Sequence, residues 1–323
     1  MPYRSPVIGR RGPRRLGPVA TPPTVVRSLA EARAARAALT GRVALVMTMG
    51  ALHEGHLSLV DEARSRADHV VVSIFVNPLQ FGPGEDFDSY PRDLDADLAT
   101  LAGHGVDLVL APDDEDVYPR EPLVRIDPGP VATVLEGASR PGHFAGVLQV
   151  VAKVLSVVRP DVAVFGQKDA QQLALVRSLV DDLSLGVEIV GAPIRRDADG
   201  LALSSRNAYL SDTERTQALA LVRALRAAED AAEDGADARS PLRAGADAAG
   251  EGPEAVVAAA SGILDGAAGV DVDYLALVDP ATFLDVPADH RGDALVAIAA
   301  RVGTTRLIDN LQITLDPTRK VTA

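Results

Sequence analysis

The sequence predicts an α/β protein, in which helices cover both faces of a parallel sheet and a smaller domain follows. Short apolar runs rich in Val alternate with helical patterns from about residue 43 to residue 190. These runs are continuously apolar, which is typical of strands that are buried on both faces. Polar motifs stand directly after several of the runs, at the strand ends where ligands bind in open parallel sheets.

The larger domain is expected over residues 25–194 as a Rossmann-like parallel sheet that binds nucleotide and substrate. Its predicted strands are Val43–Met47, Val70–Val76, Leu108–Ala111, Val162–Phe165 and Val187–Val190. Its predicted helices are His56–Ala67, Asp93–His104, Val147–Val158 and Ala170–Leu183. Strands and helices that alternate in this way are typical of parallel sheets.

The two ends of the chain differ from this central part. Residues 1–24 carry five arginines, no acid and many prolines, which favours a disordered basic tail over an anion-binding arm. The Ala-rich stretch from Ala218 to Gly266 predicts paired surface helices, interrupted near Gly235 and again between Gly250 and Pro253. Tyr274–Val278 and Ala294–Arg301 predict strands of a small mixed sheet. We therefore expect residues 195–323 to form a smaller C-terminal α+β lid domain.

Composition narrows the class of protein. The 323 residues are 47% hydrophobic, and no apolar run approaches the length of a membrane span. The absence of cysteine excludes disulfides, thiolate catalysis and cysteine zinc sites. A net charge of −13 argues against broad nucleic-acid binding. With no signal-peptide pattern, the expectation is a cytoplasmic protein without membrane or nucleic-acid partners.

The segment Thr48–His56 reads TMGALHEGH and follows the first predicted strand. A strand that passes through a glycine turn into a helix presents free N–H groups and a positive dipole end to a ligand. Imidazoles there can donate hydrogen bonds to a triphosphate, so we interpret His53 and His56 as phosphate-binding rather than as capping histidines. The pattern favours nucleotidyl transfer from ATP. It is not the His-Glu-x-x-His of zinc proteases, nor the Gly-x-Gly-x-x-Gly of dinucleotide-binding proteins.

Two amide side chains, Asn77 and Gln80, follow the second predicted strand in the sequence FVNPLQFG. Alone they would close a turn around Pro78, but amides in an apolar pocket also suit a small hydroxy acid. The acidic stretch that follows is explained chiefly by a solvated loop and a helix N-terminus. Asp97 is the predicted Mg²⁺ ligand, because Mg²⁺ on ATP takes only one or two protein carboxylates.

Two further motifs supply positive charge. The sequence FGQKDAQQ ends the fourth predicted strand, where Lys168 offers a point charge for phosphate and Gln172 faces the same crevice one turn later. The sequence LSSRN predicts a mobile loop in which two serines donate hydrogen bonds and Arg206 clamps phosphate oxygens bidentately. A helix N-cap is the alternative for this loop.

Taken together, these motifs resemble those of the pantothenate synthetase (pantoate–β-alanine ligase) family, from about Val25 to Ile313. The resemblance is carried by the segments Thr48–His56, Phe75–Phe81, Arg140–Phe144 (RPGHF), Phe165–Gln172, Leu203–Asn207 and Gly303–Asn310 (GTTRLIDN). It implies a homodimeric enzyme that uses ATP with Mg²⁺ and holds no tightly bound organic cofactor. Pantoate would attack the α-phosphorus of ATP to give pantoyl adenylate and pyrophosphate. The amine of β-alanine would then release AMP and pantothenate.

The resemblance also assigns residues to roles. The implied catalytic residues are His53, His56, Lys168 and Arg206, of which His56 would be the proton donor. The implied ATP-binding residues are Met49, Gly50, His53, His56, Gly166, Lys168, Asp169, Arg195, Leu203, Ser204, Ser205 and Arg206. The implied substrate-binding residues are Asn77, Gln80, Arg140, Phe165 and Gln172.

The chain departs from the family pattern at three positions. Met47, Ala170 and Leu203 stand where Pro, an aromatic residue and Met are common, and none of these changes removes a polar catalytic group. These three departures are therefore expected to affect the affinity for substrates more than the activity. Two alternatives stay open: another adenylyltransferase of the same superfamily, and a non-catalytic nucleotide-binding module. The amide side chains count against the first, and the full set of histidines, lysine and arginine counts against the second.

Overall fold

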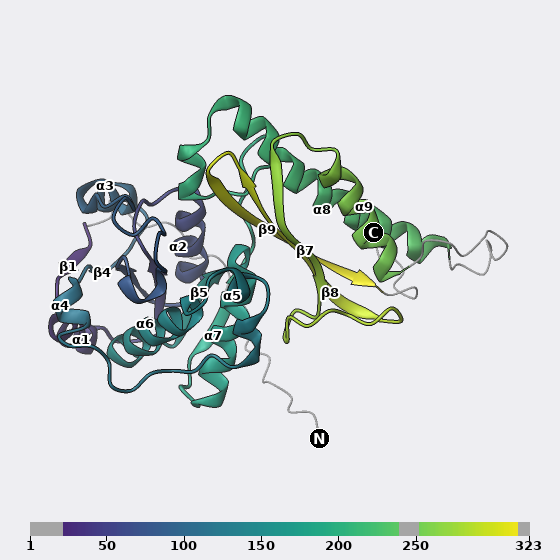
Figure 1. Ribbon diagram of the computed structural model, residues 1–323. Helices are drawn as coiled ribbons and strands as arrows, with labels where there is room; N and C mark the ends of the chain where they lie inside the picture. The colour runs from purple at the N-terminus through teal and green to yellow at the C-terminus, as the bar shows by residue number, and fades with distance from the viewer. Residues whose placement is uncertain (1–21, 239–251, 316–323) are drawn as a thin grey trace, which may run out of the picture.

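The computed structural model describes residues 22–238 and 252–315, which form two sheets with their helices (Figure 1). The larger sheet has six strands, all parallel, and the smaller has three antiparallel strands. The predicted α/β class with a smaller second unit is confirmed. The predicted basic tail lies outside the described residues except for its last three positions.

The larger sheet has the order β1-β4-β3-β2-β5-β6. Its strands are β1 (Thr24–Val26), β2 (Val43–Thr48), β3 (His69–Ile74), β4 (Leu108–Leu110), β5 (Val162–Gly166) and β6 (Glu188–Ala192). After β2, the chain adds β3 and then β4 on one side of β2. It then returns and forms β5 on the other side of β2. The carboxyl ends of β2 and β5 therefore meet at the switch point, where parallel sheets bind their ligands.

Helices cover both faces of this sheet because its strands are apolar on both sides. One face packs against α1 (Leu29–Ala38), α6 (His143–Val158) and α7 (Ala170–Asp182). The other face packs against α2 (Glu54–Arg66) and α3 (Leu94–Leu101).

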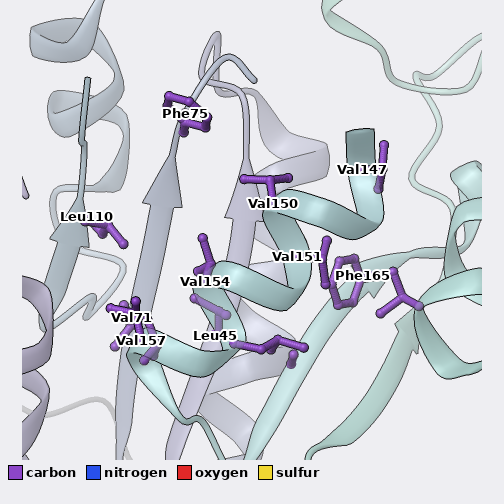
Figure 2. Close-up of a cluster of buried hydrophobic side chains, with 14 of the residues drawn as sticks. Leu45, Val71, Phe75, Leu110, Val147, Val150, Val151, Val154, Val157 and Phe165 are labelled. Atoms are coloured by element: carbon purple, nitrogen blue, oxygen red, sulfur yellow. The ribbon is translucent and has the colours of Figure 1, made fainter. Parts of the chain in front are cut away.

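Alternate residues of β2 point to opposite faces, as the period of a strand requires. Leu45 joins the core under α6, whereas Val46 joins the core under α2. Figure 2 shows Val151 and Val154 of α6 lying over the sheet, close to Phe165 and Leu45.

Short elements connect these helices and strands. They are the one-turn helices α4 (Asp114–Val117) and α5 (Glu136–Ser139), and the 3₁₀ turns η1 (Pro78–Gln80), η2 (Pro130–Thr133), η3 (Gln167–Asp169) and η4 (Ser205–Tyr209).

The smaller sheet consists of β7 (Val270–Val278), β8 (Gly292–Val302) and β9 (Thr305–Leu315). Helices α8 (Asp212–Ala238) and α9 (Pro253–Asp265) pack on one of its faces. Its other face buries Leu295 and Ala297 against Ala174 of α7. The second sheet is thereby joined to the first through α7, which lies on the side of the larger sheet that is nearer to the smaller one in Figure 1.

The structure corrects two of the sequence predictions. Helix α8 continues past Gly235 to Ala238, so the first predicted interruption is wrong, whereas the second matches the start of α9 at Pro253. The smaller sheet is antiparallel throughout the described residues, not mixed. None of the described helices is both long and apolar enough to cross a bilayer.

Candidate active site

The predicted motifs meet at the switch point of the large sheet. Strand β2 leads into the histidine turn, by which we mean residues 49–56, and its neighbour β5 leads into Lys168. A cavity of about 800 Å³ opens between the two sheets. Of the predicted site residues, its walls contain Arg140, Lys168, Asp169, Gln172, Ser204 and Arg206.

The histidine turn has an unusual backbone that delivers both imidazoles to one place. Gly50 and Ala51 both have positive φ, at +87° and +51°. His53 then caps α2, because its Nδ1 accepts the N–H of Gly55 at 3.1 Å. The Nδ1 of His56 accepts the N–H of His53 at 3.3 Å, which closes a reciprocal capping box. The ring centres are 4.2 Å apart.

These contacts fix the protonation of the two rings. Burial, with His53 and Lys168 nearby, lowers the pKa of His56 to about 3. Burial and Lys168 also lower the pKa of His53. Both rings are therefore neutral at pH 7, and each uses Nδ1 as an acceptor. The remaining proton of each ring is on Nε2, so the site holds two neutral Nε2–H donors rather than an imidazolium acid.

Lys168 belongs both to the cavity wall and to the electrostatics of the histidine turn. Its η3 turn is held by the second sheet, since Asn310 Nδ2 of β9 donates to the carbonyls of Gln167 and Lys168 at 3.0 and 2.8 Å. Gly166, at the end of β5, has no neighbouring atom closer than 4.0 Å to the place of a β-carbon. Close packing within the protein therefore does not explain this glycine.

The amide Asn77 is a structural group rather than a cavity residue. It is 1% exposed, and its Nδ2 donates to Gln80 Oε1 and to the carbonyl of Gly146. Its Oδ1 accepts the Tyr118 hydroxyl at 3.0 Å. Gln80 in turn donates from Nε2 to the Met49 Sδ at 2.9 Å, so Asn77 orients Gln80 toward the histidine turn.

The residues of the FGQKDAQQ motif, at the end of β5, also divide between the core and the cavity. Phe165 is 4% exposed and packs in the core under α6 (Figure 2). Gln171 is buried and holds residues 131–136 through three hydrogen bonds, whereas Gln172 lines the cavity.

Two arginines of the predicted site, Arg140 and Arg206, pair with neighbouring acids of one loop. Arg206 makes a bidentate pair with Asp86 at 2.9 and 3.1 Å, and Arg140 makes one with Glu85 at 2.6 and 2.7 Å. Burial alone would lower the pKa of Arg206, but Asp86 raises it above its usual value. His143 donates from Nδ1 to the carbonyl of Gln80, so its Nε2 accepts from Arg140.

The segment from Arg195 to Leu203 folds back on itself, since Leu203 N–H donates to the carbonyl of Arg195 at 2.9 Å. Leu203 lies over the start of α2, where a β-carbon on Gly55 would be 3.5 Å from its Cβ. The Ser204 hydroxyl caps η4 through the N–H of Arg206, and Ser205 Oγ lies 3.5 Å from the Tyr90 hydroxyl. The N-cap that the sequence offers as the alternative is thus present in LSSRN, whereas the mobile phosphate-binding loop stays a prediction.

Asp97 has contacts different from those of the expected Mg²⁺ ligand. It is 4% exposed, and its Oδ1 accepts the N–H of Leu52 at 2.8 Å. Its Oδ2 lies 2.8 Å from the place of a β-carbon on Gly50. Burial raises the pKa of Asp97, and the N–H groups of Ala51 and Leu52 oppose that rise. These contacts do not fit direct ligation of a metal. The described residues also contain no cluster of three or more His, Cys, Asp or Glu suited to one.

Sequence reasoning missed the partners that come from distant segments. Asp86 was visible only as part of an acidic stretch, Glu85 carried no local signal, and Asn310 lay in a quoted motif without a role. These contacts join residues 55 to 143 positions apart. A single sequence therefore offers no periodicity from which to predict them.

Comparisons with known proteins show to which family this chain is similar. The sequence profile of the pantoate–β-alanine ligase family matches residues 24–312. The chain is 56% identical over 303 residues to a pantothenate synthetase of Thermobifida fusca, which covers 91% of this chain and 96% of that protein. It is also 56% identical over 292 residues to one of Acidothermus cellulolyticus, covering 90% of this chain and 91% of that protein.

Two solved structures are similar over most of the chain. The pantothenate synthetase of Thermus thermophilus has a TM-score of 0.80 and 45% identity, and it covers 89% of this chain and 98% of its own. The pantoate–β-alanine ligase of Francisella tularensis, complexed with β-γ ATP and β-alanine, has a TM-score of 0.67 and 32% identity. That match covers 90% of this chain and 97% of its own.

Proposed function

The chain belongs to the pantoate–β-alanine ligase family, and we propose that its cleft joins the two substrates by way of pantoyl adenylate. The reaction condenses (R)-pantoate with β-alanine and converts ATP to AMP and pyrophosphate. The observation that carries the assignment of the site is the meeting of the histidine turn and Lys168 at the ends of adjacent strands. Neutral donors and a fixed positive charge there suit a triphosphate.

In the first step, a carboxylate oxygen of pantoate attacks the α-phosphorus, and the bond from the α-phosphorus to the bridging oxygen of pyrophosphate breaks. Negative charge then moves onto the departing phosphates. The Nε2–H groups of His53 and His56 donate to those oxygens, and Lys168 adds its positive charge. Because the rings are neutral, they act as hydrogen-bond donors and do not need to lose a proton.

Pantoate is held by the amides Gln80 and Gln172 in this proposal. The Nε2–H of Gln80 rests on the thioether of Met49, which is a weak acceptor and is readily exchanged for a substrate oxygen. Gln172 lines the cavity beside Lys168. Asn77 and Phe165 support this pocket from the core and are not assigned contacts with substrate.

In the second step, the uncharged amine of β-alanine attacks the acyl carbon, and AMP leaves with the electrons of the acyl–oxygen bond. The proton that the nitrogen loses passes to the AMP phosphate or to solvent. The adenylate has to be protected from water between the steps. We assign that protection to residues 195–323 acting as a lid, because the segment from Arg195 to Arg206 already covers the start of α2. Arg206 would bind phosphate after it leaves Asp86.

Mg²⁺ enters this proposal as the ion bound to ATP, where it would neutralise phosphate charge. Asp97 is not assigned as its ligand, because both carboxylate oxygens face the histidine turn. We also propose that the enzyme is cytoplasmic and acts as a homodimer. Sedimentation velocity of the purified protein tests the dimer, and a monomer at assay concentration would contradict it.

The decisive experiment follows pyrophosphate and AMP separately in mixtures of protein, ATP, Mg²⁺ and D-pantoate, with and without β-alanine. A stoichiometric burst of pyrophosphate with pantoate alone, and AMP with pantothenate only after β-alanine is added, is the expected result. Pyrophosphate that requires both substrates at once would contradict the adenylate pathway. No pyrophosphate in any mixture would contradict the ligase assignment itself.

A further inference from the structure

The carboxylate of Asp97, on α3, contacts the backbone of the histidine turn. Helix α3 contributes no other residue to the site. Its side chain is 4% exposed. Its Oδ1 accepts the N–H of Leu52 at 2.8 Å, and the N–H of Ala51 also contributes to its electrostatics. Its Oδ2 lies 2.8 Å from the place of a β-carbon on Gly50, so the carboxylate occupies the space that glycine leaves.

The turn needs such an acceptor because its backbone is strained. Gly50 and Ala51 are consecutive residues with positive φ, and Ala51 carries a β-carbon that disfavours this region by about 1 kcal/mol or more. Two N–H groups of this turn donate to side chains. The Thr48 hydroxyl accepts that of Gly50 at 3.3 Å, and Asp97 accepts that of Leu52. Without the carboxylate, a partly buried N–H would lose its partner.

The same turn sets the direction of the imidazoles. Leu52 immediately precedes His53, whose backbone N–H and side chain form the capping box with His56 and Gly55. A change in the backbone at Leu52 therefore rotates the N-cap and both rings together. A displacement of about 1 Å in groups that position a reaction can reduce its rate about a hundredfold.

We propose that Asp97 is a positioning residue for adenylyl transfer, which holds residues 50–52 so that His53 and His56 aim their Nε2–H groups at the phosphates of ATP. This inference rests on the proposed function of the site. It assigns Asp97 a role through the histidine turn, without contact with substrate or metal.

The first test reads the imidazoles directly and needs no activity. The chain has six histidines, so long-range ¹H–¹⁵N spectra can resolve the tautomer and pKa of each ring. In the wild type, His53 and His56 should be neutral Nε2–H tautomers at pH 7. Asp97→Ala should broaden or mix these tautomers and move the pKa of His56 toward its ordinary 6.5. The signal of His290, which lies between β7 and β8, serves as an internal reference.

The second test measures adenylation in three variants. Asp97→Ala should reduce the burst rate of pyrophosphate formation about a hundredfold. Asp97→Asn keeps one carbonyl oxygen for Leu52 N–H, so this variant should fold. Its burst rate should be at least tenfold higher than that of Asp97→Ala. Asp95→Asn is the matched control, since Asp95 is exposed in the same first turn of α3 and carries the same charge. It should leave both the spectra and the burst unchanged.

Several outcomes separate this role from others. Unchanged imidazole spectra in a folded Asp97→Ala protein would overturn the proposal. So would a loss of activity that excess Mg²⁺ restores, because that result identifies a metal ligand. If the wild type forms no pyrophosphate, the proposed function fails, and the spectra alone then decide whether Asp97 positions the turn.

Discussion

The imidazoles of His53 and His56 obtain their chemistry from the first turn of α2. Each ring gives its Nδ1 lone pair to a backbone N–H, and this leaves the Nε2 proton available to a ligand. The sequence offers helix capping and phosphate binding as competing explanations, but capping uses Nδ1 and leaves Nε2 for the proposed phosphate contact. The sequence predicts these residues and their ligand class. It does not show the lowered pKa values, because these depend on burial and on Lys168.

Replacing the two histidines separates capping from hydrogen bonding. His56→Ala removes the donor and also the acceptor for His53 N–H, so adenylation should fall by about 10²- to 10³-fold. Unfolding free energy should fall by about 1 kcal/mol. His53→Ser removes the imidazole but keeps a good N-cap, so it should reduce adenylation with little loss of stability. Pyrophosphate bursts and urea unfolding followed by circular dichroism measure both. Normal turnover of His56→Ala with a native unfolding curve would contradict the assignment.

At the scale of secondary structure, the buried parallel strands are the part that the sequence predicts well. Runs such as Val43–Met47 and Val162–Phe165 lie within one or two residues of β2 and β5. Strand β9 was missed, because Asp309 and Asn310 interrupt its apolar pattern. Both side chains are buried: Asp309 pairs with Arg196, and Asn310 holds the η3 turn. The role of these two polar residues cannot be predicted from the sequence, because their partners belong to other elements.

The loop after η1 is a second case in which the element, not the residue, carries the effect. Residues 85 and 86 present consecutive carboxylates to Arg140 and Arg206. In the proposed reaction, Arg206 exchanges the carboxylate of Asp86 for phosphate when ATP binds. On that proposal the loop competes with ATP for Arg206.

Neutralising Asp86 should strengthen ATP binding for this reason. Asp86→Asn should lower the Kd for ATP by about threefold, since a partly exposed ion pair contributes up to about 1 kcal/mol. Asp88→Asn is the control, because Asp88 is exposed in the same loop and carries the same charge. Isothermal titration calorimetry measures both. An equal gain in the two variants would mean that general charge, not the pair with Arg206, limits binding.

For the whole molecule, the cleft depends on contacts that fix one sheet against the other. Glu136 of α5 is 9% exposed and accepts two hydrogen bonds from Arg306 of β9 at 2.6 and 2.9 Å. The hydroxyl of Tyr274 on β7 donates to the same carboxylate at 3.0 Å. Burial alone would raise the pKa of Glu136, but Arg306 lowers it below its usual value. Glu136 is thus ionised, and it connects the two halves of the protein.

Breaking this connection should cost more than removing one neutral hydrogen bond. Glu136→Gln leaves the half-buried Arg306 with Asp273 as its remaining acid partner, so unfolding free energy should fall by about 3 kcal/mol. Tyr274→Phe removes only a hydroxyl and should cost about 1 kcal/mol. The chain has no tryptophan, so urea unfolding is best followed by circular dichroism. Equal losses in the two variants would show that the charge of Glu136 is not what stabilises the junction.

The same buried groups set how stability depends on pH. Burial lowers the pKa of His56 to about 3, and burial with Arg140 nearby lowers that of His143 to about 4. In the unfolded chain both histidines have their ordinary pKa of 6.5. Below that pH the unfolded state therefore binds more protons than the folded state. Stability should therefore be constant with respect to these groups above about pH 6.5. Below it, stability should fall by about 1.4 kcal/mol per pH unit for each histidine.

Carboxylates such as Glu85 and Glu136, whose pKa values are lowered, act in a more acidic range. Their contribution is present above the ordinary pKa of 4.5 and is lost as pH falls below it. The interval between about pH 6.5 and pH 5 therefore isolates the histidines. Urea unfolding across this interval should give a slope that decreases by between about a third and a half in His143→Gln, because His143 is one of three histidines whose pKa values are lowered. A flat wild-type profile would mean that these rings titrate in the folded protein as they do in the unfolded chain. That result would contradict the lowered pKa values on which the neutral-donor mechanism rests.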